Sequence, residues 1–201
     1  YKISIGQWLA TVTGYDYRTT TYTDGAAHAS GGSISLLYHR GKGPVLAGST
    51  LSYGLTEPLN MQQPRGARRH ASLIMRLEYE DGGRLYTTAV DPRAAIRVNH
   101  MENTVTAFVT AHFVESNTWE PDGEGRTAKL VYTFREDSLE IAVRVSPGRA
   151  PVRFVLPVVE DTVAVTADRP GQKEPIFYLS GGFAADEYRF DAVDRLRVEL
   201  R

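Results

Sequence analysis

The sequence predicts an all-β protein, a large antiparallel β-sandwich of about a dozen strands. Apolar residues alternate with polar ones in many short runs, which is the period of a half-buried strand. Turn-forming Gly, Pro, Asp and Asn residues separate these runs at close spacing, as antiparallel neighbours require. No segment keeps an apolar stripe at helical spacing over three turns. A closed barrel is the alternative architecture.

Length and composition indicate one domain and argue against two classes of partner. We expect the 201 residues, 1–201, to form a single sandwich cut from a longer protein, since the chain starts at Tyr1 without an initiator Met. The balance of 23 Lys and Arg against 24 Asp and Glu creates no overall field for nucleic acid or an anionic membrane. No apolar run approaches the roughly 20 residues that cross a bilayer. We therefore expect neither nucleic acid nor membrane as a partner.

The first half of the chain predicts a strand and a β-hairpin separated by polar loops. Residues 2–13 suggest the first strand, and residues 15–29 suggest an ordered loop rich in tyrosine. Residues 28–53 alternate on both sides of a short glycine-bearing connection at 40–43, which is typical of a hairpin. Residues 54–71 form the longest irregular connection, and loops of this length are often functional.

The second half is more regular. A turn at Asp81-Gly82-Gly83 predicts a second hairpin, and a long strand follows with its core face on Val105, Ala107, Val109, Ala111 and Phe113. A meander is expected next, with core residues that include Leu130, Tyr132, Ile141, Val143, Phe154 and Leu156. We interpret residues 146–151 as one of its turns, and Pro157 as the mark of an edge strand or a bulge. Short strands near residues 163, 176 and 196 complete the pattern.

His28, just before the first hairpin, is the leading candidate for chemistry. At the mouth of a strand its imidazole would neutralise an anionic group or act as a general acid, while Gly31 and Gly32 would let a ligand approach the backbone. The alternative is structural: the histidine caps the strand and the two glycines form a β-bulge.

Aromatic and basic side chains gather in the predicted loops. Tyr17, Tyr22, Tyr53 and Trp119 could stack on sugar rings, whereas packing against the ends of the sandwich is the alternative. The loop of residues 54–71 also carries the one concentrated basic patch. Its Arg65, Arg68 and Arg69 could pair with uronate or sulfate groups, although such runs are more often a solvated surface.

The sequence gives no signal for a metal or another cofactor. The chain has no cysteine, which excludes a disulfide framework and a thiolate metal site. None of its five histidines is paired at a spacing that would project two ligands from one strand face. Nucleotide-binding and phosphate-binding glycine motifs are also absent. We expect no bound metal and no cofactor.

The segment from His28 to Leu46 resembles the histidine-to-hairpin segment of heparinase II/III-like polysaccharide lyases. It reads His-Ala-x-x-Gly-Ser-x-x-Leu-Leu-x-x-x-Gly-x-Gly-Pro-Val-Leu. The resemblance implies an N-terminal helical toroid, a β-sandwich similar to this chain, and β-elimination on uronate-containing polysaccharides. It also implies that His28 lies in the cleft between the two domains. The metal-binding aspartate of that family has no counterpart among residues 47–49, and its catalytic tyrosine base belongs to the toroid.

These observations lead to one functional expectation and one competitor. We expect the sandwich part of a lyase for acidic polysaccharide, located in the periplasm or outside the cell, with His28, Tyr53 and Tyr22 as its catalytic candidates. Because the sandwich supplies one wall of a cleft, we expect it to be inactive without the helical toroid. The competing interpretation is a non-catalytic carbohydrate-binding or structural module.

Overall fold

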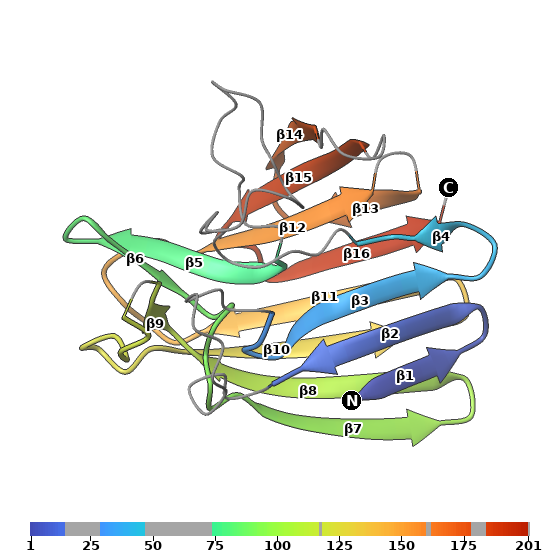
Figure 1. Ribbon diagram of the computed structural model, residues 1–201, viewed down its shortest axis with the longest axis horizontal. Helices are drawn as coiled ribbons and strands as arrows, with labels where there is room; N and C mark the ends of the chain where they lie inside the picture. Colours follow the sequence, from blue (N-terminus) through green and yellow to red (C-terminus); the bar gives the residue numbers. More distant parts are fainter. Residues whose placement is uncertain (15–28, 47–73, 117, 160–161, 178–183, 201) are drawn as a thin grey trace, which may run out of the picture.

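The computed structural model describes residues 1–14, 29–46, 74–116, 118–159, 162–177 and 184–200. This part of the chain contains strands and no helix, and its strands form three open antiparallel sheets. Figure 1 shows the sheet of the N-terminal strands lying in front of a second sheet, with a third sheet above. The predicted all-β antiparallel sandwich is confirmed.

We refer to the three sheets as the front, back and upper sheets. The front sheet, in spatial order, contains β1 (Lys2–Ile5), β2 (Trp8–Thr13), β3 (Ser33–His39) and β4 (Gly43–Pro44). The back sheet contains β13 (Val163–Ala167), β16 (Arg195–Leu200), β11 (Ser138–Val145), β10 (Thr127–Phe134), β8 (Thr104–His112) and β7 (Ala95–Met101). The upper sheet contains β14 (Gly171–Phe177), β15 (Ala184–Asp191), β12 (Arg153–Val159), β5 (Arg76–Asp81), β6 (Arg84–Thr87) and β9 (Val114–Glu115).

The front and upper sheets together form one layer, and the back sheet forms the other. The two sheets of the first layer meet where Leu46 bridges to Val158 and the Val159 amide donates to the Val45 carbonyl at 2.9 Å. One continuous core contains side chains of all three sheets. The predicted core face of β8 and the six meander residues chosen from the sequence all lie buried in this core, so these predictions are confirmed.

Both predicted hairpins are present. The turn between β5 and β6 places Gly82 and Gly83 at φ of 56° and 75°, which suits a two-residue hairpin loop. The first hairpin pairs β3 with β4, but β4 is only two residues long, and Leu46 bridges to the upper sheet instead. The first hairpin therefore also joins the front sheet to the upper one.

Two strand predictions were wrong or incomplete. Residues 2–13 form two strands, because Gly6 at φ 54° and Gln7 close a tight turn that pairs Ile5 with Trp8. β15 was missed, since charged residues, Asp186, Glu187 and Arg189, interrupt its apolar ones and leave no continuous apolar face in the sequence. Ion pairs and a central position between β12 and β14 hold it in the sheet.

The expected turn at residues 146–151 is a crossing between layers. β11 belongs to the back sheet and β12 to the upper sheet, so the two strands do not pair. β12 lies between β15 and β5 and pairs with β15 without a register shift, so the prediction of an edge strand or a bulge at Pro157 was wrong. Pro157 pairs with Glu187 on one side, and on the other side the β5 ladder has already ended at Val155. Proline is tolerated there because no ladder bond requires its missing N–H.

Candidate functional site

Most residues predicted to form the site lie outside the described residues. These are His28, Tyr17, Tyr22, Tyr53, Arg65, Arg68 and Arg69. The structure does describe Trp119 and the points at which the two predicted loops join the sandwich: Gly14 and Ala29 for the first loop, and Leu46 and Ile74 for the second.

Three of the four joining points, Gly14, Ala29 and Ile74, lie at the end of the sandwich where β8 ends and β9 follows. Ala29 and Trp119 pack against a small apolar cluster of Ile74, Ala89, Val90 and Val114. Gly14 lies near the carbonyl oxygen of Ala94, a residue that closely follows Val90 of this cluster. We define the anchor end by the residues Gly14, Ala29–Gly32, Ile74, Thr88–Asp91, His112 and Trp119.

The glycine pair of the anchor end forms a turn locked against a neighbouring segment. Gly31 and Gly32 have φ of 62° and 76°, and the Ser33 amide closes the turn by donating to the Ser30 carbonyl at 2.9 Å. A Cβ on Gly31 would overlap the Thr88 carbonyl oxygen, and one on Gly32 would overlap the Val109 side chain. The protein's own Thr88 and Val109 therefore occupy the space beside the two glycines. The glycines form a turn, which corrects both predictions for them, a ligand approaching the backbone and a β-bulge.

Trp119 is held in a costly backbone conformation at the same end. Its φ is 61°, unusual for a bulky residue. Glu115 fixes this loop, since its carbonyl accepts the Trp119 amide at 2.8 Å and its carboxylate accepts the Thr118 amide at 2.7 Å. The indole is half-buried against the apolar cluster. A rigid, partly exposed aromatic ring of this kind is suited to stacking on a sugar.

Asp91 is the buried polar centre of the anchor end. Its side chain is 0 % exposed and accepts the Arg93 amide at 2.9 Å and the His112 amide at 2.7 Å. The carboxylate oxygen Oδ2 also lies 3.0 Å from His112 Nδ1, and the Asp91 carbonyl accepts the Ser30 hydroxyl at 3.1 Å. Sequence reasoning missed this pair because Asp91 and His112 lie 21 residues apart and only the fold joins them.

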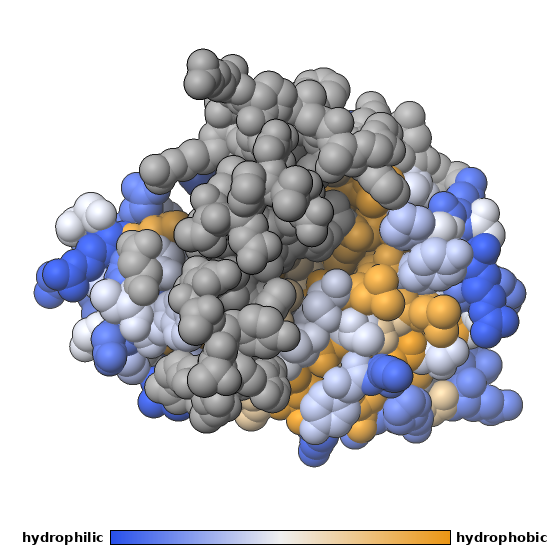
Figure 2. All heavy atoms as spheres, viewed as in Figure 1, coloured by the Kyte–Doolittle hydropathy of each residue, from blue (hydrophilic) through white to orange (hydrophobic). Residues whose placement is uncertain are grey.

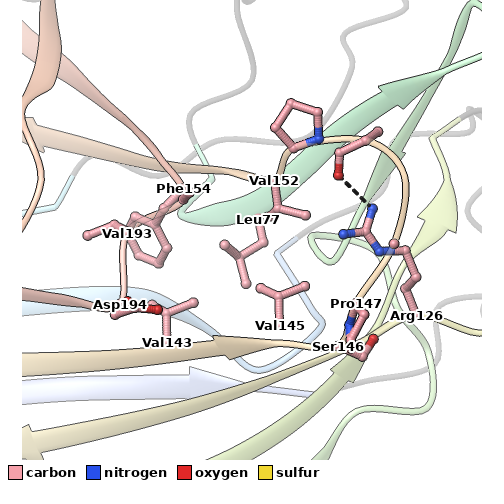
Figure 3. A pocket seen from close by; sticks show the side chains of 14 residues that line it. Leu77, Arg126, Val143, Val145, Ser146, Pro147, Val152, Phe154, Val193 and Asp194 are labelled. Carbon is pink, nitrogen blue, oxygen red and sulfur yellow. Dashed lines mark hydrogen bonds between the residues drawn. The ribbon is translucent and has the colours of Figure 1, made fainter.

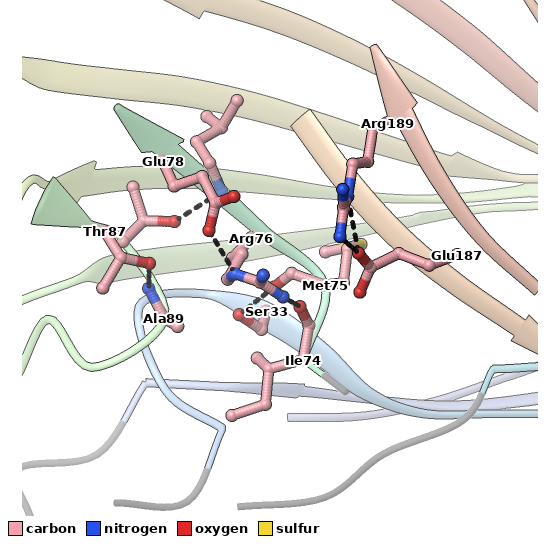
Figure 4. A network of polar contacts seen from close by, with 11 residues as sticks. Ser33, Ile74, Met75, Arg76, Glu78, Thr87, Ala89, Glu187 and Arg189 are labelled. Atoms are coloured by element: carbon pink, nitrogen blue, oxygen red, sulfur yellow. Dashed lines mark hydrogen bonds and ion pairs between the residues drawn. The ribbon is translucent and has the colours of Figure 1, made fainter. Parts of the chain in front are cut away.

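A second polar cluster fastens the upper sheet next to Ile74 (Figure 4). Arg76 binds Glu78 at 2.6 Å and donates to the Ile74 carbonyl at 3.0 Å, while Arg189 binds the buried Glu187 at 2.7 Å. Burial opposes the charge of Arg189, but the hydrogen bond and charge of Glu187 outweigh it and raise the pKa of the guanidinium. These charges hold β5 and β15 in place.

A pocket of about 250 Å³ opens between the back and upper sheets (Figure 3). Its walls are mostly apolar, and Arg126 lines one side with its guanidinium 4.4 Å from the centre of the Tyr79 ring. Arg126 also donates to the Ala150 carbonyl at 3.1 Å and packs against Gly148. Arg126 thus fastens the crossing segment 146–151 to the core.

Tyr79, beneath Arg126, is held by a buried carboxylate. Its hydroxyl donates to Asp122 at 2.6 Å, while Asp122 also accepts the Arg126 amide at 2.9 Å. Burial and the hydrogen bond to Asp122 raise the pKa of the Tyr79 hydroxyl above its ordinary value. This phenol therefore stays protonated and serves as a hydrogen-bond donor.

The outer face of the front sheet carries the exposed Leu36 beside hydroxyl-bearing side chains of Thr11, Thr13 and Ser35. Leu36 on β3 is 44 % exposed, and Leu9 on β2 is half-buried on the same face. In Figure 2 hydrophobic residues lie within this face, with hydrophilic ones around the rim.

The described ranges contain no group of three His, Asp or Glu side chains placed to hold a metal ion. In the same ranges, no helix is long and apolar enough to cross a membrane.

Comparison with known proteins identifies the family. The family model described as "Ulvan lyase C-terminal domain" matches residues 1–170. A protein of Formosa agariphila named "Broad-specificity ulvan lyase" is 27 % identical over 156 residues, which cover 77 % of this chain and 24 % of the relative. The chain thus spans about a quarter of the length of that relative, and no solved structure matches it. The prediction of a relation to polysaccharide lyases is thus confirmed, but these matches do not point specifically to the heparinase II/III-like lyases. The chain belongs to the ulvan lyase C-terminal domain family.

Proposed function

We propose that this chain is the β-sandwich part of a polysaccharide lyase that cleaves an acidic polysaccharide by β-elimination, with ulvan as the first substrate to test. The family match over residues 1–170 carries the proposal. The ulvan lyase of Formosa agariphila supports it, because that protein is about four times longer than the stretch it shares with this chain. In the proposed arrangement the sandwich, residues 1–201 as one domain, follows a helical toroid as in heparinase II/III-like lyases, in the periplasm or outside the cell.

β-Elimination on a uronate needs a base for the C5 proton, a group that neutralises the carboxylate and an acid for the leaving oxygen. In this proposal the base comes from the helical domain, while His28, Tyr53 and Tyr22 supply the neutralising and acid groups. The packing of the residue that follows His28 supports the choice of His28. Ala29, directly after His28, packs with Trp119 against the cluster that contains Ile74.

Binding residues are assigned on the same basis. Trp119, fixed at φ 61° and half-buried, would stack on a sugar ring, and Tyr17 would add a second aromatic face. Arg65, Arg68 and Arg69 precede Ile74 in the chain and would bind the anionic groups of the polysaccharide.

The sandwich provides one wall of the cleft in this proposal. Holding a substrate in a reactive geometry is worth roughly 7–11 kcal/mol of barrier. Without the opposing wall, the isolated 201 residues are expected to be inactive and to bind acidic polysaccharide weakly.

The experiment compares the longer parent protein with the isolated chain. Each is incubated with ulvan, heparan sulfate, alginate and hyaluronan while the ultraviolet absorbance of the unsaturated product is recorded. We expect turnover by the parent protein, none by the isolated chain, and a loss of about 100-fold or more in the His28→Ala parent. Turnover by the isolated chain that His28→Ala abolishes would show that the sandwich carries a complete active site. Binding without turnover by the parent would instead favour a non-catalytic carbohydrate-binding module.

A further inference from the structure

Asp91 and His112 form a hydrogen-bonded pair to which the proposed function assigns no role. We propose that His112 is a substrate-binding residue whose Nε2 accepts a hydrogen bond from a sugar hydroxyl of the acidic polysaccharide, with Asp91 as its positioning residue. This inference rests on the proposed function and adds a contact to the same site. It concerns binding and involves no covalent step.

The contacts of Asp91 determine which ring nitrogen of His112 carries the proton. Oδ1 accepts the Arg93 amide at 2.9 Å, and Oδ2 accepts the His112 amide at 2.7 Å. A carboxylate that accepts from backbone amides can accept a ring N–H as well, so the 3.0 Å contact with Nδ1 places the ring proton on Nδ1. In the neutral ring Nε2 is then left as an acceptor.

The ring is oriented and accessible at the same time. The Asp91 side chain is 0 % exposed, whereas the His112 side chain is 36 % exposed. Nε2 has no hydrogen-bond partner among the residues that the structure describes. When one ring nitrogen is bound to a buried carboxylate, the orientation of the imidazole is fixed. The other nitrogen is then free to bind a ligand from that fixed position.

The local fold does not require a histidine side chain at residue 112. The two backbone amides already bind Asp91 and fix the turn that precedes β7, whatever side chain residue 112 carries. The outward row of β8 otherwise holds Thr104, Thr106, Phe108 and Thr110. His100, on β7 at the opposite end of the same sheet, is exposed and makes no ring hydrogen bond with the described residues. It therefore provides a matched control.

The position of the pair connects it with the sugar-stacking residue proposed above. Asp91 directly follows Val90, which belongs to the apolar cluster against which Trp119 packs. The Asp91 carbonyl also accepts the hydroxyl of Ser30, two residues after His28. An aromatic face and an oriented acceptor on adjoining segments match the two surfaces of a sugar ring, its apolar face and its hydroxyl rim.

The first measurement examines the histidine rings of the chain by long-range ¹H–¹⁵N spectra, before and after addition of ulvan oligosaccharides. We expect His112 to carry its proton on Nδ1 in the free protein and its Nε2 resonance to shift on binding, while the His100 ring stays unchanged. A ring protonated on Nε2 in the free protein would overturn the proposal. So would binding that shifts other resonances of the protein and leaves the His112 ring unchanged.

The second measurement uses the longer parent enzyme and three variants. We expect His112→Ala to raise KM about tenfold, the effect of one lost hydrogen bond, with kcat changed less than twofold. His112→Gln, which offers an oxygen acceptor, should recover part of the affinity, and His100→Ala should match the unaltered enzyme. Equal KM values for His112→Ala and His100→Ala would refute the role of His112 while leaving the proposed function intact. If the unaltered enzyme neither cleaves nor binds any acidic polysaccharide, both proposals fail.

Discussion

The back sheet and the anchor end are held together by different kinds of contact. β8 and β10 pair without interruption from Thr127 opposite His112 to Phe134 opposite Val105, and alternate side chains enter the core. At the anchor end, segments far apart in the chain meet through single bonds such as that from the Ser30 amide to the Ala89 carbonyl. A repeated pattern thus determines the sheet, whereas a few individual residues determine the end that we propose binds polysaccharide.

The largest expected effect of a single substitution lies at the anchor end. In Gly31→Ala the new Cβ would overlap the Thr88 carbonyl at a residue with φ 62°, so we expect destabilisation of roughly 5 kcal/mol or failure to fold. Gly83→Ala is the matched control, since Gly83 has φ 75° but nothing within 4 Å of the new Cβ, and should cost about 1–2 kcal/mol. Urea unfolding of both variants measures the difference. Equal midpoints would mean that the contact with Thr88 is not tight.

In the back sheet, a core truncation should have the next largest effect. Ile141 is 0 % exposed and Leu130 is 3 % exposed, so replacing either with Ala should cost about 3 kcal/mol by leaving a cavity. Thr133→Ala changes an outward side chain of β10 and should cost less than about 0.5 kcal/mol. Unchanged unfolding midpoints for Ile141→Ala and Leu130→Ala would show that the assignment of strand faces is wrong.

Tyr132 connects the two regions, because its buried hydroxyl donates to the Gly32 carbonyl at 2.8 Å. Tyr132→Phe should cost about 1–1.5 kcal/mol, the value of one buried hydrogen bond. The loss should be visible locally, as faster hydrogen exchange of the Ser30 and Gly32 amides, while the β10–β11 ladder keeps its protection. Uniformly faster exchange throughout the back sheet would indicate that the two regions unfold as one unit.

The smallest predicted effect is a pH dependence of the same residue. Burial raises the pKa of the Tyr132 hydroxyl above its ordinary value of about 10. Stability from such a group is complete below the unfolded pKa and is lost as the pH rises, because only the unfolded chain ionises there. At pH 10.5 the unaltered chain should have lost roughly 0.8 kcal/mol more than Tyr132→Phe. Parallel stability curves for the two proteins between pH 8 and 10.5 would contradict the raised pKa.

Most of the back sheet could be predicted from the sequence, because the alternation of apolar and polar residues that defines each strand lies within a short stretch of the chain. Val105, Ala107, Val109 and Ala111 alternate with outward residues in a single strand, and this period alone assigns their faces. β15 could not be recognised in this way, since Glu187 is buried through its bond to Arg189 and not through an apolar side chain. The crossing at 146–151 was also hidden, because a Pro-Gly turn fits a hairpin as well as a change of layer.

The anchor end was predictable only in outline. Trp119 was correctly placed in a loop, and the glycines after His28 were recognised as special positions. The actual neighbours, the Thr88 carbonyl for Gly31 and the Val109 side chain for Gly32, lie more than fifty residues further along the chain, where no local pattern indicates them. Asp91 and His112 likewise become a pair only through the fold. Contacts between distant backbone segments leave no periodic signal, so the site had to be found in the structure.

Binding of acidic polysaccharide at the anchor end can be measured by backbone amide chemical shifts during titration of the chain with ulvan oligosaccharides. We expect the largest shifts at the residues of the anchor end: Ala29–Gly32, Ile74, Thr88–Asp91, His112 and Trp119. The Gly82-Gly83 turn and the outward-facing Lys129 and Arg144 of the back sheet should shift little. Largest shifts at Lys129 and Arg144, or no shifts at any concentration, would contradict binding at the anchor end.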